Sequence, residues 1–131
     1  MPDMNNTFPT EENLSGLNRK DFQKDIDDKQ TDLFILKNKK GMEVAVTNYG
    51  CAILSIMVPD KNGKYANVIL GHDSIDHVIN SPEPFLSTTI GRYGNRIAKG
   101  KFTLYAEEHS LTINNGPNSL HGGPTGFHAR V

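Results

Sequence analysis

The sequence predicts an all-β protein built from consecutive antiparallel strands. From residue 31 onward, short runs of β-branched and aromatic residues are separated by glycine, proline, asparagine and other turn residues. The turns recur at intervals of roughly eight to twelve residues, which is typical of a sandwich or a barrel rather than of a parallel α/β sheet. Neither an internal repeat nor a low-complexity tract interrupts the pattern.

The first predicted strands follow one another across short turns. Residues 32–37 ("DLFILK") and 42–48 ("MEVAVTN") are the first pair, and 52–58 ("AILSIMV") comes next. Residues 65–71 ("YANVILG") form the return strand, because the Asn-Gly pair at 62–63 tolerates the positive φ angles of a tight hairpin.

Strand 42–48 is predicted to have two unlike faces. Alternate side chains of a strand point to opposite sides of the sheet. Glu43 and Thr47 share one side, so we expect that side to contact water. The apolar side carries Met42, Val44 and Val46.

Three further segments complete the prediction. Segment 13–26 carries scattered apolar residues and is expected to lie as a strap over a sheet, with a short helix after Asn18. Residues 75–79 have apolar residues at helical spacing, and Asp73 or Ser74 can cap that helix. Segment 101–113 is expected to form a hairpin whose inward side chains are Phe102, Leu104, Leu111 and Ile113.

The composition excludes several classes of function. The 131 residues are 36% hydrophobic and 22% charged, a balance that fits one modest globular domain. A net charge of -1 provides no overall field to attract nucleic acid or an anionic membrane. The apolar run 51–58 is far shorter than the roughly 20 residues of a membrane span, and the amino terminus lacks the features of a secretory signal. We therefore expect a cytoplasmic protein with no nucleic-acid or membrane partner.

Residues 91–96, "GRYGNR", form the first candidate binding motif. Gly91 and Gly94 permit tight backbone geometry, and Arg92, Asn95 and Arg96 offer planar polar groups that suit a hydroxyl-rich ligand. Surface arginines in a turn would explain the same pattern, so both explanations stay open. The spacing is not that of a dinucleotide-binding loop.

The second candidate motif is "NSLHGG", residues 118–123. His121 precedes two glycines, so its imidazole lies on a loop that a substrate can approach, and histidine is the side chain that most often transfers protons near neutral pH. It can serve as a general acid, a general base or a hydrogen-bond donor. A loop histidine bonded to the backbone is the alternative.

Other reactive side chains do not form a recognisable site. Cys51 has no second cysteine to pair with and lies in an apolar run, so we expect it to be buried as a small hydrophobe. The pairs His72/His77 and His121/His128 lack metal-ligand spacing, and no metal site is predicted. A nucleophile elbow, G-x-S-x-G, is also absent from the sequence.

The order and spacing of several motifs closely resemble the amino-terminal part of the aldose 1-epimerases, the galactose mutarotases. These motifs are "VTNYG", "VILGHDS", "TIGRYGNRIAKGKFTL" and "NNGPNSLHGGPTGF". The resemblance runs over residues 15–131. It implies an antiparallel β-sandwich, the galactose mutarotase-like supersandwich, incomplete in this chain and truncated at its C-terminal end, after a mobile leader at 1–14.

The resemblance also implies a function. Family members interconvert the α and β anomers of free aldohexoses such as galactose and glucose, without a metal or nucleotide cofactor. Their motif asparagine and arginine, which bind sugar hydroxyls, fall on Asn95 and Arg96, and the histidine that contacts the sugar falls on His121.

Ring opening needs a base for the anomeric hydroxyl and an acid for the ring oxygen. In the family these are a glutamate and a second histidine well downstream of the "LHGG" motif. No catalytic residue is therefore expected in this chain, which is predicted to be inactive alone and to need the missing C-terminal part of the domain. The alternatives are a non-catalytic carbohydrate-binding module and one chain of a split protein.

Overall fold

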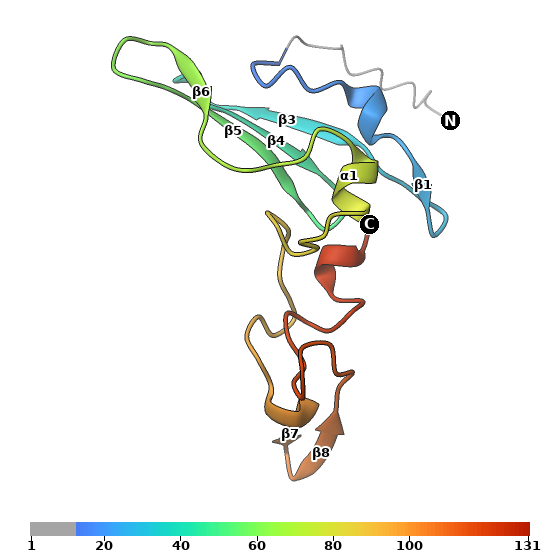
Figure 1. The fold of residues 1–131 in the computed structure, drawn as a ribbon. Coiled ribbons are helices and arrows are strands. Elements are labelled where there is room, and N and C mark those ends of the chain that lie inside the picture. Colours follow the sequence, from blue (N-terminus) through green and yellow to red (C-terminus); the bar gives the residue numbers. More distant parts are fainter. Residues whose placement is uncertain (1–12) are drawn as a thin grey trace, which may run out of the picture.

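The computed structural model describes residues 13–131 and confirms the antiparallel all-β class (Figure 1). Strands β3 to β6 form a four-stranded sheet in sequence order, and β1-β2 and β7-β8 are separate two-stranded pairs. The strands are β1 (Asp25–Ile26), β2 (Lys29–Gln30), β3 (Leu33–Lys37), β4 (Glu43–Thr47), β5 (Ile53–Pro59), β6 (Tyr65–Asn67), β7 (Lys101–Leu104) and β8 (Glu107–Ser110).

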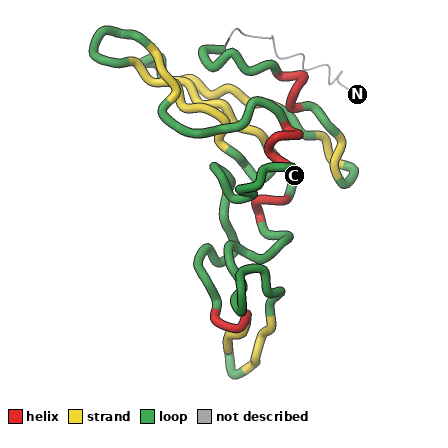
Figure 2. The backbone as a smooth tube through the Cα atoms, in the orientation of Figure 1, coloured by secondary structure: helices red, strands yellow, loops and turns green. Residues whose placement is uncertain are grey.

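The chain forms an upper sheet region and a lower extension of loops. Figure 1 shows the four-stranded sheet, the strap and α1 (Ile75–Ile79) together, with the hairpin β7-β8 at the far end of the extension. Figure 2 shows that loops make up most of the extension. The chain then returns to the sheet, and in the turn between β4 and β5 Gly50 N donates to Arg130 O over 2.7 Å. The remaining short helices are η1 (Arg19–Phe22), η2 (Ala98–Gly100) and η3 (Phe127–Ala129).

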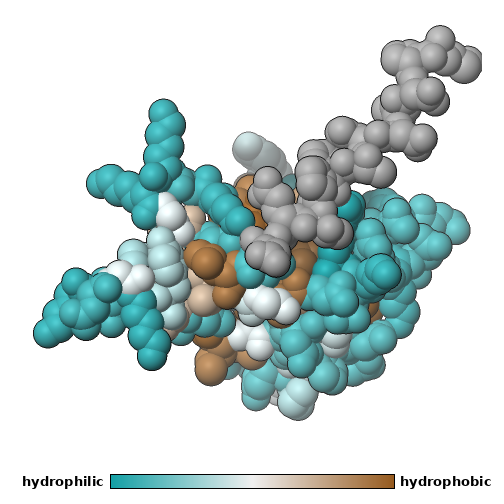
Figure 3. All heavy atoms as spheres, turned by 90° about the horizontal axis from the view of Figure 1, so that it is seen from above, coloured by the Kyte–Doolittle hydropathy of each residue, from teal (hydrophilic) through white to brown (hydrophobic). Residues whose placement is uncertain are grey.

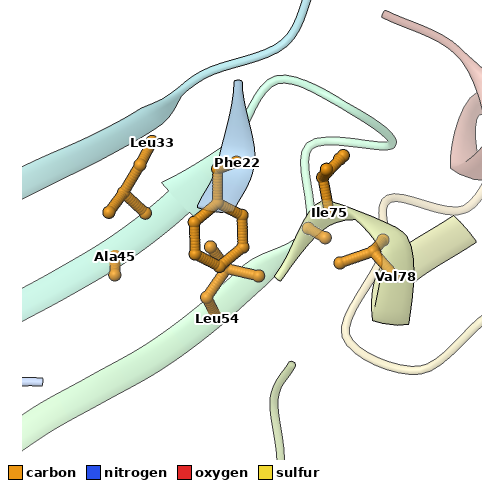
Figure 4. Close-up of a cluster of buried hydrophobic side chains, with 7 residues drawn as sticks. Phe22, Leu33, Ala45, Leu54, Ile75 and Val78 are labelled. Atoms are coloured by element: carbon orange, nitrogen blue, oxygen red, sulfur yellow. The ribbon is translucent and has the colours of Figure 1, made fainter. Parts of the chain in front are cut away.

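The core lies between the sheet, the strap and α1 (Figure 4). Phe22 is fully buried at the end of η1, which begins after Asn18 as predicted because the Asn18 side chain accepts from Lys20 N. Burying one such side chain contributes about 1.5–3 kcal/mol relative to its exposure. The other buried members of the cluster are Leu33, Ala45, Ala52, Leu54, Ile75 and Val78.

Helix α1 also confirms its prediction. The side chain of Ser74 accepts a hydrogen bond from His77 N over 3.3 Å, so Ser74 rather than Asp73 is the N-cap. Ile75 and Val78 are buried against the core, as their spacing predicted. None of the helices in residues 13–131 has the length and apolar character needed to cross a bilayer.

The predicted orientation of β4 is wrong. Glu43, Ala45 and Thr47 are the buried residues, while Val44 and Val46 are only half-buried. Glu43 is 0% exposed because the strap covers it: its carboxylate accepts from Leu14 N at 2.8 and 2.9 Å and from Ser15 N at 3.2 Å. These bonds replace the water that a buried charge loses.

Apolar side chains of β3 lie on the face of the sheet that points away from the core. Phe34 and Leu36 pair with Val46 and Val44 on the face away from the core, and they are 46% and 60% exposed. Hydrophobic side chains therefore reach the surface among mostly hydrophilic ones, as the brown spheres in Figure 3 show.

Three other expectations differ from the structure. The return strand β6 ends at Asn67, well before residue 71. The hairpin forms at 101–110, and all four predicted inward residues are exposed because no element of the described chain covers them: Phe102, Leu104, Leu111 and Ile113. Cys51 is exposed with a φ of 43°, because it sits in the turn before β5 rather than inside the strand.

The leader predicted for residues 1–14 lies outside the described residues as far as residue 12. Beyond that point the strap is tied down by side chains. Asn13 Nδ2 donates to Leu17 O over 2.8 Å, and Arg19 forms an ion pair with Asp32. The hydrogen bonds from Arg19 hold the pKa of the Asp32 carboxyl below its usual range. The stability that this pair contributes is present above the ordinary aspartate pKa and is lost as the pH falls below it.

Replacing Glu43 tests whether the carboxylate anchors the strap. Glu43→Gln keeps the shape but loses the charge and one of the two accepting oxygens. We expect the free energy of unfolding to fall by about 1.5–3 kcal/mol, the range for hydrogen bonds to a charged group. Urea denaturation measures this. Glu108→Gln, on an exposed glutamate that pairs with Lys101, is the control and should change little; equal losses in both variants would contradict the anchor.

Candidate functional site

The two predicted motifs lie side by side. Ile97 N donates to Ser119 O over 2.8 Å, and Ser119 N returns a bond to Ile97 O over 3.1 Å. At the other end, Phe127 N donates to Gly91 O over 3.4 Å. The backbone itself therefore joins the segment 91–97 to the segment 119–127.

Gly122 makes the contact between these segments possible. A Cβ atom at this position would lie 1.8 Å from Gly91 O, and the φ angle of Gly122 is +87°, which side chains disfavour. Gly91 is under a similar constraint, because its Cβ would lie 2.5 Å from the Phe127 ring. The motif glycines thus allow two loops to approach within a distance that no other residue type permits.

A hollow of about 850 Å³ opens where the segments meet. Its polar lining includes Asn95 and Arg96, two of the three predicted sugar-binding residues. Apolar rings cover another part of the wall, a combination that suits the alternating polar and apolar surfaces of a small organic ligand. The remaining lining residues are Gly91, Arg92, Tyr93, Ile97, Phe102, Leu111, Thr112, Ser119, Gly122, Gly123, Pro124, Thr125, Gly126, Phe127 and Arg130.

Arg96 is held by one of its guanidinium nitrogens. Its Nε donates to Asn115 Oδ1 over 2.8 Å, which fixes the plane of the group and leaves the two terminal nitrogens as donors for a ligand. The Asn95 side chain turns back on the backbone, where its Oδ1 accepts from Arg96 N over 2.7 Å. The Asn95 amide nitrogen remains the donor of that group.

His121, in the second motif, is bonded to the first motif but does not line the hollow. Its Nδ1 is hydrogen-bonded to the carbonyl oxygen of Gly94. Because a carbonyl only accepts, Nδ1 carries the hydrogen, and Nε2 is the accepting nitrogen of the neutral ring. His121 is thus a loop histidine bonded to the backbone, as the alternative to a catalytic or binding role proposed. The bond orients the imidazole and leaves Nε2 available.

Sequence reasoning missed the supporting roles of the asparagine-rich run before the second motif. Asn115, which was not singled out, accepts a hydrogen bond from Arg96 Nε. The Asn114 side chain accepts from Leu120 N over 2.7 Å and donates to Leu120 O over 3.0 Å, so it brackets the residue before His121. The signal was the "NNGPN" run itself, because asparagine side chains readily satisfy backbone groups in loops.

Arg92, named in the first motif, lines the same wall as Phe127 and Arg130, which the sequence analysis did not single out. The Arg92 guanidinium lies 5.5 Å from the centroid of the Phe127 ring, within cation–π range. Arg130 Nε donates to Thr125 O over 3.2 Å. Each of these contacts depends on a loop that returns from the hairpin, which residue patterns alone do not reveal.

His128 is buried beside this site. It is 6% exposed, and its Nδ1 finds no hydrogen-bond partner in the described chain. Burial, with a smaller contribution from His121, lowers the pKa of the His128 imidazole. The neutral ring therefore stabilises the fold above the ordinary histidine pKa, and this stabilisation is lost as the pH falls through the lowered value. No three His, Cys, Asp or Glu side chains of residues 13–131 gather as metal ligands do.

The geometry matches a known family. The family model described as aldose 1-epimerase matches residues 32–130. The chain belongs to the aldose 1-epimerase family. Among solved structures, the aldose epimerase homologue from C. elegans has a TM-score of 0.71 at 33% identity and covers 76% of this chain and 30% of its own. The galactose 1-epimerase from Lactobacillus acidophilus NCFM has a TM-score of 0.64 at 32% identity, over 80% of this chain and 30% of its own.

Curated members of the aldose 1-epimerase family agree with this assignment. The galactose mutarotase of Bos taurus is 44% identical over 86 residues, which are 66% of this chain and 25% of that protein. The aldose 1-epimerase of Escherichia coli (strain K12) is 38% identical over 98 residues, or 75% of this chain and 28% of that protein. The chain thus spans about a quarter of the length of the curated relatives it matches.

Two glycine substitutions separate steric contact from backbone strain in this epimerase-family site. Gly122→Ala places a methyl group on the Gly91 carbonyl, whereas Gly116→Ala, at φ +55°, meets no atom within 4 Å. We expect Gly116→Ala to cost about 1–2 kcal/mol of unfolding free energy from strain alone. Gly122→Ala should cost clearly more and shift the NMR signals of segments 91–97 and 119–127. Equal costs in thermal or urea unfolding would contradict the close contact.

Proposed function

We propose that this chain supplies part of the substrate site of an aldose 1-epimerase that interconverts the anomers of aldohexoses such as galactose and glucose. One observation carries the proposal. Within a chain of this family, Asn95 and Arg96 line a single hollow that both motifs build. The relatives named galactose mutarotase and aldose 1-epimerase support the choice of ligand.

In this proposal, Asn95, Arg96 and His121 bind the sugar and do not transfer protons. The two terminal nitrogens of Arg96 and the amide of Asn95 donate to sugar hydroxyls, and Arg96 is already oriented by Asn115. His121 is not among the residues that line the hollow, so in this proposal it reaches a sugar at the edge of the hollow, through Nε2, since Gly94 O holds Nδ1. Preoriented groups of this kind bind with less loss of side-chain freedom.

Ring opening additionally requires a base and an acid. We place both outside this chain. The described residues that line the hollow include no carboxylate and no imidazole. The curated relatives are also about four times as long as the matched segment, so their remaining length can hold an acid and a base. A cytoplasmic location and the absence of a cofactor belong to the same proposal.

A non-catalytic carbohydrate-binding module is the second candidate. The same lining favours it, because the hollow offers hydrogen-bond donors and apolar rings but none of the usual proton-transfer groups. The two candidates differ in whether a further part of the domain completes the site.

Polarimetry of freshly dissolved α-glucose tests the division of roles. We expect the 131-residue chain to leave the rate of mutarotation at the buffer value, since the proposal places the acid and the base outside it. A complete relative from the same family is the positive control and should accelerate the change in rotation. Acceleration by the chain alone would show that it carries its own acid and base.

Galactose titration followed by NMR tests the binding role of Arg96. We expect Arg96→Ala to weaken binding by roughly 10- to 100-fold, because a charged hydrogen-bond donor is worth about 1.5–3 kcal/mol. Lys99→Ala removes the same charge three residues away, outside the lining of the hollow, and should leave affinity nearly unchanged. If both variants bind galactose as tightly as the unmodified chain, the role assigned to Arg96 is wrong.

A further inference from the structure

The His121 imidazole needs more than one contact to keep a fixed orientation. The hydrogen bond from Nδ1 to Gly94 O restrains one edge of the ring but allows it to swing about that bond. A second restraint comes from Phe85. The ring centroids of Phe85 and His121 are 4.7 Å apart with an interplanar angle of 61°, an edge-to-face arrangement that aromatic rings favour.

The same Phe85 ring contacts a second histidine. Its centroid lies 4.6 Å from that of His128, also at 61°. Phe85 therefore packs against both imidazoles at nearly equal distances. His128 is held more firmly than His121 because its side chain is buried. Gly50 packs against the His128 backbone and bonds to Arg130 O, and Gly126 packs against the His128 ring.

His128 lies directly behind the wall of the hollow. A Cβ atom on Gly126, which lines the hollow, would lie 3.2 Å from His128 Nδ1. That nitrogen has no hydrogen-bond partner in the described chain, so the ring is held by packing rather than by polar contacts. The lowered pKa of His128 agrees with a ring that stays neutral beside His121.

The loop that carries Phe85 is itself tied to the main sheet. Ser87 O accepts from Ile53 N at the start of β5 over 2.9 Å, and Ser87 Oγ donates to Leu70 O over 2.7 Å. Thr89 N donates to Gly50 O over 2.8 Å. The loop that carries Phe85 is therefore fixed to the main sheet, whereas His121 lies on a glycine-rich loop and needs contacts to keep its orientation.

The geometry points to Phe85 as a positioning residue that fixes the His121 imidazole for contact with the sugar, with the buried His128 as its support. This rests on the sugar-binding role proposed for His121. Phe85 packs against the His121 ring and does not line the hollow, so its role is to orient His121. An apolar side chain of similar volume would fill the space but would lose the edge-to-face contacts with both imidazoles.

The test uses the 131-residue chain labelled with ¹⁵N in its histidines. In the unmodified chain, His121 should show one tautomer, with hydrogen on Nδ1, and ring protons shifted by the Phe85 ring current. Phe85→Leu should leave the Nδ1 tautomer in place, because Gly94 O still accepts from it, but should broaden the His121 ring-proton signals as the ring swings and raise the galactose dissociation constant roughly three- to ten-fold. Phe85→Tyr keeps the aromatic ring and should retain the signature of the unmodified chain.

Phe34→Leu is the matched control. Phe34 lies on the exposed face of β3, outside the site, so its replacement should alter neither the His121 signature nor galactose affinity. Backbone spectra show whether each variant keeps the fold. If Phe85→Leu does not fold, the ring-current shift of His121 in the unmodified chain still decides whether the two rings pack together.

Two outcomes are distinguishable. Sharp His121 ring-proton signals together with unchanged galactose affinity in folded Phe85→Leu, or the absence of the ring-current shift in the unmodified chain, overturns the positioning role. Failure of the unmodified chain to bind galactose overturns the proposed function instead, and the spectra of His121 in Phe85→Leu and Phe85→Tyr still report on the packing. The positioning role is supported if the His121 ring-proton signals broaden in Phe85→Leu but not in Phe85→Tyr or Phe34→Leu.

Discussion

The close approach of Gly122 to the Gly91 carbonyl is the constraint on which the site depends. The hollow exists because two loops, separated by the hairpin β7-β8, come within a distance that leaves no room for a side chain. The flanking backbone bonds between Ile97 and Ser119 then hold the loops in register. Arg96 and His121 owe their placement to this junction, because each is oriented by an atom contributed by the other side: Asn115 Oδ1 for Arg96 and Gly94 O for His121.

The fold shows which features local sequence specifies and which need long-range contacts. Strand alternation and helix capping are local, so the antiparallel class, the hairpin at 101–110 and the helix after Ser74 followed from the sequence. The buried side of β4 did not. Glu43 is charged, and its burial depends on backbone donors 28 and 29 residues earlier in the chain. The local sequence around Glu43 does not predict these contacts. The exposure of Phe102 has the same origin, since burial of an apolar face requires another element to cover it.

The candidate site divides in the same way. The spacing of Asn95 and Arg96 alone left a surface turn open, and the resemblance of the whole motif to the family singled them out; both side chains line the hollow. The orientation of His121 depends on the carbonyl of Gly94, and carbonyl directions are set by loop dihedral angles that residue identity does not encode. The contacts of Phe85 with two histidines are equally invisible in sequence, because they join three segments that meet only in the folded chain.

The distribution of polar groups around the hollow has a consequence for how the reaction can be organised. Anomer exchange moves one proton from the anomeric hydroxyl and delivers another to the ring oxygen, so it needs groups that titrate near neutral pH. Arginine keeps its proton and asparagine has none to give at that pH, so Arg96 and Asn95 can orient a sugar but cannot exchange protons with it. Under the proposed function, recognition and proton transfer are therefore carried by different parts of the sequence. The rigid junction at Gly91 and Gly122 serves such a division well, because a sugar fixed by these loops presents its reacting oxygens at a constant position to whatever groups face it.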